Sequence, residues 1–90
     1  LGSALLEETV VDGAAYRNPD LAEYLVPTAA DAPEVEALLV PDPDDRVDAL
    51  GLKGLGELGI IGVHAAIANA VHHATGRRIR SLPIRLEDVA

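Results

Sequence analysis

The stretch "LGLKGLGELGIIGVHAAIANAV", residues 50–71, decides the fold of this chain. Its second half is an apolar run with helical spacing, and the same spacing continues a few residues further. Such a pattern predicts one helix over about residues 60–75. The positions that define it are Ile60, Val63, Ile67, Ala70 or Val71, and Ala74. Gly76 then stands where a left-handed helix cap is favoured, so we expect the helix to end there.

The remainder of the chain contains only short extended segments. The β-branched run at residues 9–11 stops at Asp12-Gly13, a strong turn signal, and residues 35–40 read as a second strand. The Pro-Asp-rich segment 41–45 cannot lie in a sheet. We therefore predict an α+β fold of short strands with one main helix, whose apolar face packs on strands near Val10 and Val40.

Composition limits how stable such a fold is by itself. The chain has 90 residues, and Phe, Trp, Met and Cys are all absent. A core built from Leu, Val, Ile and Ala in so short a chain buries little surface. We therefore interpret residues 1–90 as a single unit, a fragment that packs against more protein. The absence of Cys excludes disulfides and thiolate metal sites, and we expect a reducing, cytoplasmic location.

The charge is strongly acidic and unevenly distributed. The net charge is -8, and residues 1–52 hold 12 acidic side chains against 2 basic ones. Nucleic-acid binding needs basic patches and stacking rings, so this class of partner is not expected. The apolar run at residues 58–71 is shorter than a bilayer requires and contains His64 and Asn69, so no membrane span is predicted.

The glycine loop at residues 54–59, "GLGELG", satisfies the spacing of a dinucleotide-binding fingerprint. That site also needs a buried strand before the loop and an acidic residue after a second strand. Here acidic residues precede the loop, and the basic segment 77–80 occupies the later position. Glu57 would also place a negative charge where a pyrophosphate binds. We therefore reject nucleotide binding.

Glu57 is the only charged side chain between Lys53 and Arg77. One interpretation is a solvated carboxylate in the first turn of a helix, which the macrodipole favours. The other is a placed general base, because a lone acid in apolar, glycine-lined surroundings suits proton transfer. Glycines on both sides favour close approach of other atoms but leave both interpretations open.

The three histidines do not form a metal-binding pattern. His72 and His73 are adjacent and lie on different helix faces, and His64 is two turns away from His72. We interpret them as helix-surface or interface residues. Asn69 is expected to tie down a neighbouring backbone rather than to contact a substrate.

Several separated motifs resemble the carboxy-terminal end of the molybdenum-binding subunit of the xanthine dehydrogenase and aldehyde oxidase family. They are "ALLEETVVDG", "NPDLAEYLVPTAADAPEVE" and "GLKGLGELGIIGVHAAIANAVHHATGRRIRSLPI". The resemblance covers nearly the whole chain. It implies a fragment of a larger molybdopterin-binding domain.

The resemblance also implies an activity. Glu57 occupies the position of the family's catalytic base, in a hydroxylase that oxidises an aldehyde or heteroaromatic substrate with water as the oxygen source. Gly54 and Gly56 would give the cofactor close backbone approach, and this chain would supply no metal ligand. The implied cofactor is molybdopterin-bound molybdenum, with iron–sulfur clusters and usually FAD in partner subunits or domains.

The short length of the chain limits the activity expected of it alone. Most cofactor contacts of the family lie outside the motifs present, so the isolated 90 residues are expected to be inactive. The alternative is a non-catalytic remnant or interaction module that keeps the fold and binds no cofactor.

Overall fold

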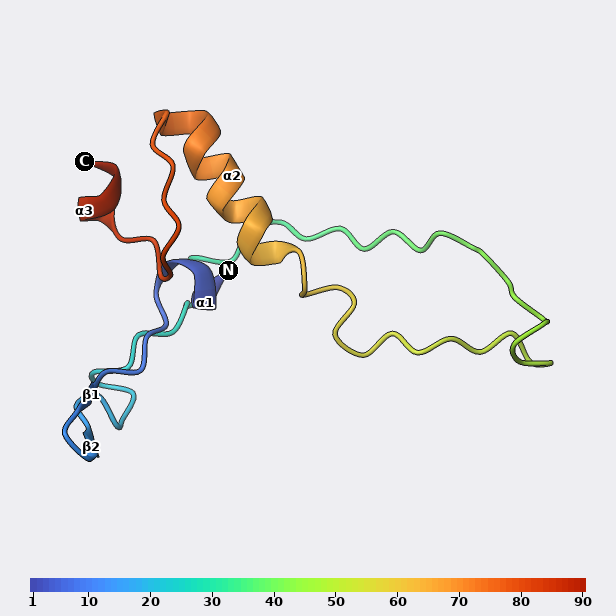
Figure 1. The fold of residues 1–90 in the computed structure, drawn as a ribbon, viewed down its shortest axis with the longest axis horizontal. Helices are drawn as coiled ribbons and strands as arrows, with labels where there is room; N and C mark the ends of the chain where they lie inside the picture. Colours follow the sequence, from blue (N-terminus) through green and yellow to red (C-terminus); the bar gives the residue numbers. More distant parts are fainter.

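A computed structural model describes residues 1–90 (Figure 1). It contains three helices and one small sheet. The elements are α1 (Gly2–Leu5), β1 (Val11–Asp12), β2 (Ala15–Tyr16), α2 (Val63–Thr75) and α3 (Leu86–Val89). This agrees with the predicted combination of short strands and one main helix. None of the helices has the length and apolar character of a membrane-spanning segment.

The core is small and lies where the two ends of the chain meet. Ala4 of α1 is fully buried, and Ile84, just before α3, is 6% exposed. The N–H of Ile84 donates a hydrogen bond of 2.8 Å to the carbonyl of Ala4. Gly2 is also buried, because its backbone lies against the side chains of Glu7 and Pro27. We call α1, α2 and residues 82–89 the folded end.

The main helix begins later than predicted. Residues 56–62 form successive turns rather than helix, and α2 starts at Val63. Glycines at positions 56, 59 and 62 weaken regular helix there, because glycine loses the most backbone entropy on folding. The predicted cap is confirmed: Gly76 has φ 75°, and its N–H donates to the carbonyl of His72 at 2.8 Å.

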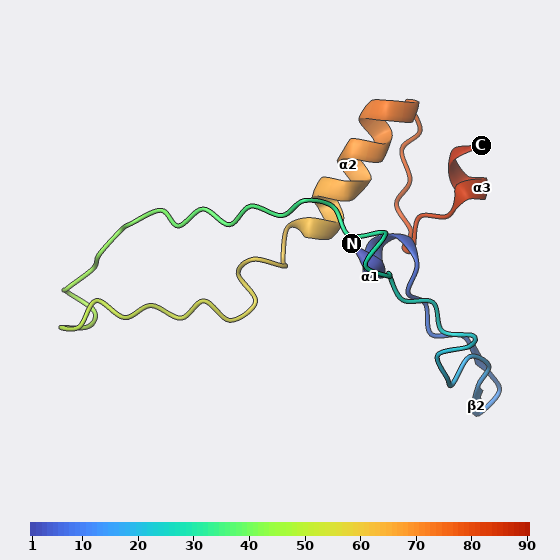
Figure 2. The ribbon, with the colours of Figure 1, turned by 180° about the vertical axis from the view of Figure 1, so that it is seen from behind.

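The predicted turn at Asp12-Gly13 is also confirmed. β1 and β2 pair antiparallel with Val11 opposite Tyr16, and Gly13 adopts φ 63° in the turn. The hairpin does not support α2, however. Figures 1 and 2 place it at the far side of α1, and Val11 is 59% exposed. The predicted packing of α2 on a strand near Val10 is wrong.

Helix α2 packs on α1 instead. A half-buried stripe runs along it at the predicted helical spacing. It comprises Val63, His64, Ile67, Ala68, Val71 and His72. Of the predicted positions, Val63, Ile67 and Val71 lie on this half-buried stripe, while Ile60 and Ala74 are exposed. The partner of the stripe is the first helix.

Residues 32–62 form a long arm that projects from the folded end and returns to α2 (Figure 2). The predicted strand at 35–40 is wrong as an element of this chain, since no segment pairs with it. The Nζ of Lys53 pairs with the Oδ2 of Asp42 at 3.1 Å across the arm. The radius of gyration is 18.0 Å, whereas a compact domain of this length has about 12 Å.

Candidate functional site

Glu57 lies in the turns that connect the arm to α2. Its carbonyl accepts hydrogen bonds from the N–H groups of Ile60 at 3.0 Å and Ile61 at 3.2 Å. Its side chain is exposed. The first turn of α2 contains no acidic residue, so Glu57 is not the helix-start carboxylate that one interpretation required. These hydrogen bonds hold the backbone of Glu57 in a turn, and its carboxylate is exposed to solvent.

The glycines around Glu57 border open space. A Cβ built on Gly54 or Gly56 would meet no atom of the chain within 4 Å, and the same holds for Gly59. None of these three has a positive φ, so the backbone conformation does not require glycine there. Their smallness therefore serves no contact inside this chain. It leaves room for atoms that come from outside it.

The chain brings together no group of three or more His, Asp or Glu side chains that could hold a metal ion. The exposed Glu57 carboxylate and the open space beside Gly54 and Gly56 leave room for a cofactor beside the loop. The roles of Glu57, Gly54 and Gly56 stay predictions.

Two of the three histidines, His64 and His72, make side-chain hydrogen bonds. The Nε2 of half-buried His64 lies 2.7 Å from the Oγ of Ser3, which joins α2 to α1. The guanidinium of Arg78 donates to the Nδ1 of His72 at 2.9 Å and to the Oδ1 of Asn69 at 2.6 Å. The prediction that Asn69 holds backbone is wrong, because its partner is a side chain. His64 lies at the contact between α1 and α2, and His72 at the helix surface beside Arg78, in agreement with the interpretation of the histidines as helix-surface or interface residues.

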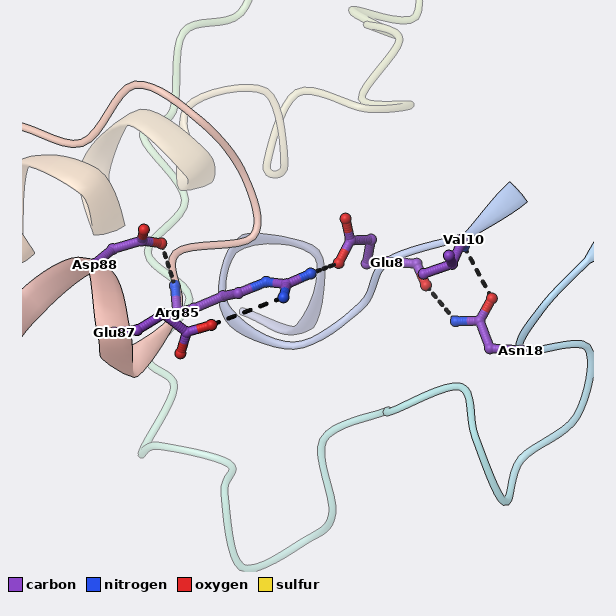
Figure 3. A network of polar contacts seen from close by, with 6 residues as sticks. All are labelled: Glu8, Val10, Asn18, Arg85, Glu87 and Asp88. Atoms are coloured by element: carbon purple, nitrogen blue, oxygen red, sulfur yellow. Dashed lines mark hydrogen bonds and ion pairs between the residues drawn. The ribbon is translucent and has the colours of Figure 1, made fainter. Parts of the chain in front are cut away.

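A polar network joins α3 to the segment before the hairpin (Figure 3). The guanidinium of Arg85 pairs with the carboxylate of Glu8, and the N–H of Arg85 donates to Asp88 at 2.9 Å. The side-chain amide of Asn18 donates to the carbonyl of Glu8 at 2.6 Å and accepts from the N–H of Val10 at 2.9 Å. Asn18, the first residue of the Asn-Pro motif, therefore closes the base of the hairpin.

The Pro-Thr motif has a local role as well. The N–H and the hydroxyl of Thr28 each donate to the Oδ2 of Asp31 at 2.8 Å. These hydrogen bonds favour the ionised form and lower the pKa of Asp31 below its ordinary value of 3.8. Sequence reasoning did not identify this turn, nor the roles of Ser3 and Arg78. Only the Pro-Thr-x-x-Asp spacing offered a signal for the turn.

The chain is similar to individual proteins of known type. No protein-family model matches it. It is 47% identical over 89 residues to the molybdenum-binding subunit of an aldehyde oxidoreductase of Escherichia coli, a match that covers 97% of this chain. It is 44% identical over 86 residues, 93% of its length, to a xanthine dehydrogenase molybdenum-binding subunit of Escherichia coli.

A third relative is the gamma subunit of the 6-hydroxypseudooxynicotine dehydrogenase complex of Paenarthrobacter nicotinovorans. It is 34% identical over 93 residues, which cover 99% of this chain. The matches span only 12%, 11% and 12% of these three relatives, so the chain corresponds to a small part of each. On this evidence the chain belongs, as a segment, to the family of molybdenum-binding subunits of xanthine dehydrogenases and aldehyde oxidoreductases.

Proposed function

We propose that residues 1–90 are the carboxy-terminal part of a molybdopterin-binding domain in a molybdenum hydroxylase. The complete subunit would oxidise an aldehyde or heteroaromatic substrate with water as the oxygen source, and Glu57 would be its catalytic base. The observation that carries this proposal is the exposed carboxylate of Glu57 in a glycine loop. The space beside that loop is free of the chain's own atoms.

The cofactor would be held mainly by residues of the subunit that lie outside this chain. When bound, a pterin-held molybdenum centre would supply the two-electron redox chemistry. Gly54 and Gly56 would let the backbone approach this cofactor, because neither carries a Cβ that would occupy the space. Iron–sulfur and FAD subunits or domains would be the partners that take the electrons onward.

Glu57 would act by accepting a proton at a carboxylate oxygen as the water-derived oxygen attacks the substrate carbon. General-base catalysis needs hydrogen-bond reach to that proton and a carboxylate held in one place. The turn that binds the Glu57 carbonyl to Ile60 and Ile61 holds the backbone in place. The exposed apolar side chains of Leu55, Leu58 and Ile61 would exclude water from the site once the remainder of the subunit covers them.

The test is Glu57→Gln in the full-length subunit. The amide is nearly isosteric and fills the same space, but it cannot accept the proton. The rate of substrate-driven reduction of the metal centre in a single turnover should fall about 10²–10⁴-fold at matched molybdenum content. A normal rate would contradict the role of Glu57 as the base. A full-length wild-type subunit that holds no molybdenum would instead favour the non-catalytic module.

A second test concerns the isolated chain. With no ligand group of its own, residues 1–90 should bind neither molybdenum nor pterin after expression in a host that makes the cofactor. Metal analysis of the purified chain measures this. Stoichiometric molybdenum would show that the anchoring residues lie within this segment.

A further inference from the structure

We propose that the hydrogen bond between His64 and Ser3 is a positioning contact for the carboxylate of Glu57. This inference rests on the proposed function, in which Glu57 is the base. It gives two residues outside the glycine loop a share in the rate of the reaction, because they hold the start of the helix on which that loop ends.

The loop of Glu57 makes no side-chain tie of its own to the folded end. The nearest residues on either side whose side chains form a hydrogen bond or an ion pair are Lys53, which pairs within the arm, and His64. Leu58 and Ile61, which follow Glu57, are 67% and 72% exposed. Within this chain the place of the carboxylate is therefore set by the backbone that follows it and by whatever holds that backbone.

A series of backbone hydrogen bonds joins Glu57 to α2. The carbonyl of Glu57 accepts from the N–H groups of Ile60 and Ile61. The N–H of Val63, the first residue of α2, in turn donates to the carbonyl of Ile60 at 3.1 Å. Coupling between sites is carried by such bonded networks and by rigid elements. A displacement of the start of α2 is therefore passed on to Glu57.

His64 holds the start of α2. It lies in the first turn of the helix and is half-buried. Its Nε2 lies 2.7 Å from the Oγ of Ser3 in α1, and α1 is bonded in turn to Ile84 through the carbonyl of Ala4. A hydrogen bond is directional, whereas apolar contact between the helices is not. This bond therefore fixes the orientation of the helix end that is nearest to Glu57 in the sequence.

Small displacements of a base are costly for catalysis. Proton transfer needs the heavy atoms within about 2.6–3.2 Å of each other, and a misplacement of about 1 Å can reduce a rate about 10²-fold. Loss of one exposed hydrogen bond is a mild change that leaves the fold in place. The proposal predicts a loss of about 10-fold, which is smaller than the loss expected on removal of the base itself.

The primary experiment is Ser3→Ala in the full-length, cofactor-loaded subunit. At matched molybdenum content, the single-turnover rate of metal reduction at saturating substrate should fall about 10-fold. The substrate concentration for half the maximal rate should stay within about twofold, because Glu57 acts in the chemical step and not in binding. Ser3→Thr keeps a hydroxyl and should retain the rate. An unchanged rate in Ser3→Ala, or an equal loss in Ser3→Thr, would overturn the proposal.

Double variants separate positioning from a general loss of stability. His64→Phe breaks the same bond from the other side, so its combination with Ser3→Ala should be no slower than the slower single variant. In the Glu57→Gln background, Ser3→Ala should have no further effect, since no base is left to be positioned. Additive losses in the first pair, or a further fall in the second, would mean that the bond serves the fold alone and would overturn the proposal.

The chain offers a matched control for each residue. His73, on the same helix, and Ser81 are exposed, and neither side chain takes part in a hydrogen bond. His73→Phe and Ser81→Ala should leave the rate within about twofold. A fall in these controls equal to that in Ser3→Ala would overturn the special role of the bond.

Hydrogen exchange gives a readout that does not depend on catalysis. Peptides that cover residues 57–63 of the full-length subunit should exchange about 5-fold faster in Ser3→Ala than in the wild type. Unchanged exchange would overturn the positioning contact. A normal rate in Glu57→Gln overturns the proposed base, whatever the exchange shows. A slow Glu57→Gln together with a normal Ser3→Ala overturns only the positioning contact.

Discussion

The folded end contains the few buried residues of this chain, whereas the arm contains none. In the folded end, Ala4 and Ile84 are buried and their backbones are hydrogen-bonded to each other. In the arm, Val35 and Val47 are 82% and 83% exposed. Hydrophobicity alone therefore does not decide what folds within this chain. The presence of a partner element does, because α1 has α2 and residues 35–40 have none.

The comparison also separates two kinds of glycine. Gly76 and Gly13 are in the left-handed region and shape local structure. Gly54 and Gly56 have neither a positive φ nor a neighbour within 4 Å. The first kind shapes the backbone of this chain, and the second kind borders open space.

The largest expected effect concerns two carboxylates of the arm. Glu57→Gln should reduce turnover about 10²–10⁴-fold, whereas Asp45→Asn at the tip should leave it within about twofold. Both changes neutralise one exposed acid, so a purely electrostatic role of the acidic arm predicts equal losses. Steady-state kcat of the full-length subunit measures both, and equal losses would remove the special status of Glu57.

The next effect tests the core of the folded end. Ile84→Ala should destabilise the isolated chain by about 2 kcal/mol, since truncating a buried Ile removes its packing and leaves a cavity. Val47→Ala in the arm should cost less than about 0.5 kcal/mol, because an exposed side chain loses little. Denaturant titration followed by the circular dichroism of α2 compares them. A similar cost at both positions would mean that the folded end is not an independent core.

A smaller effect distinguishes the two kinds of glycine. Gly76→Ala should destabilise the end of α2 by about 1 kcal/mol, because an L side chain is strained in the left-handed region. Gly59→Ala should be neutral or stabilising by about 0.5 kcal/mol, since it only restricts the unfolded chain. Helical circular dichroism of the isolated chain reports both. Destabilisation by the Gly59 change would reveal a contact in the loop.

The smallest effect is the titration of Asp31. Its folded-state pKa is lowered, so its contribution to stability is complete above the ordinary value of 3.8 and is lost as pH falls through the folded pKa. Thr28→Val removes the donating hydroxyl and should move the pKa of Asp31 back towards 3.8. Thr28→Ser keeps the hydroxyl and should not. NMR titration of the Asp31 carboxyl carbon measures both variants.

Local signals in the sequence were enough to predict α2, its cap at Gly76 and the turn at Asp12-Gly13. The start of α2 was misplaced, because Ile60 continues the apolar period while the glycines around it oppose helix. The strand at 35–40 could not be placed, since pairing depends on a partner that this chain does not contain. The contacts of Ser3 with His64 and of Glu8 with Arg85 join distant residues, and no local pattern predicts such pairs.

The same distant contacts set the order in which the chain can fold during synthesis. Ser3 and His64 are 61 positions apart, and Glu8 and Arg85 are 77 positions apart. Closing contacts of such separation is slow and has to wait until both partners have left the ribosome. Within this segment, helix α1 therefore emerges well before the residues that bury it, and Ala4 is covered only when Ile84 appears. Until then its apolar face is open to other parts of the nascent chain or to a chaperone.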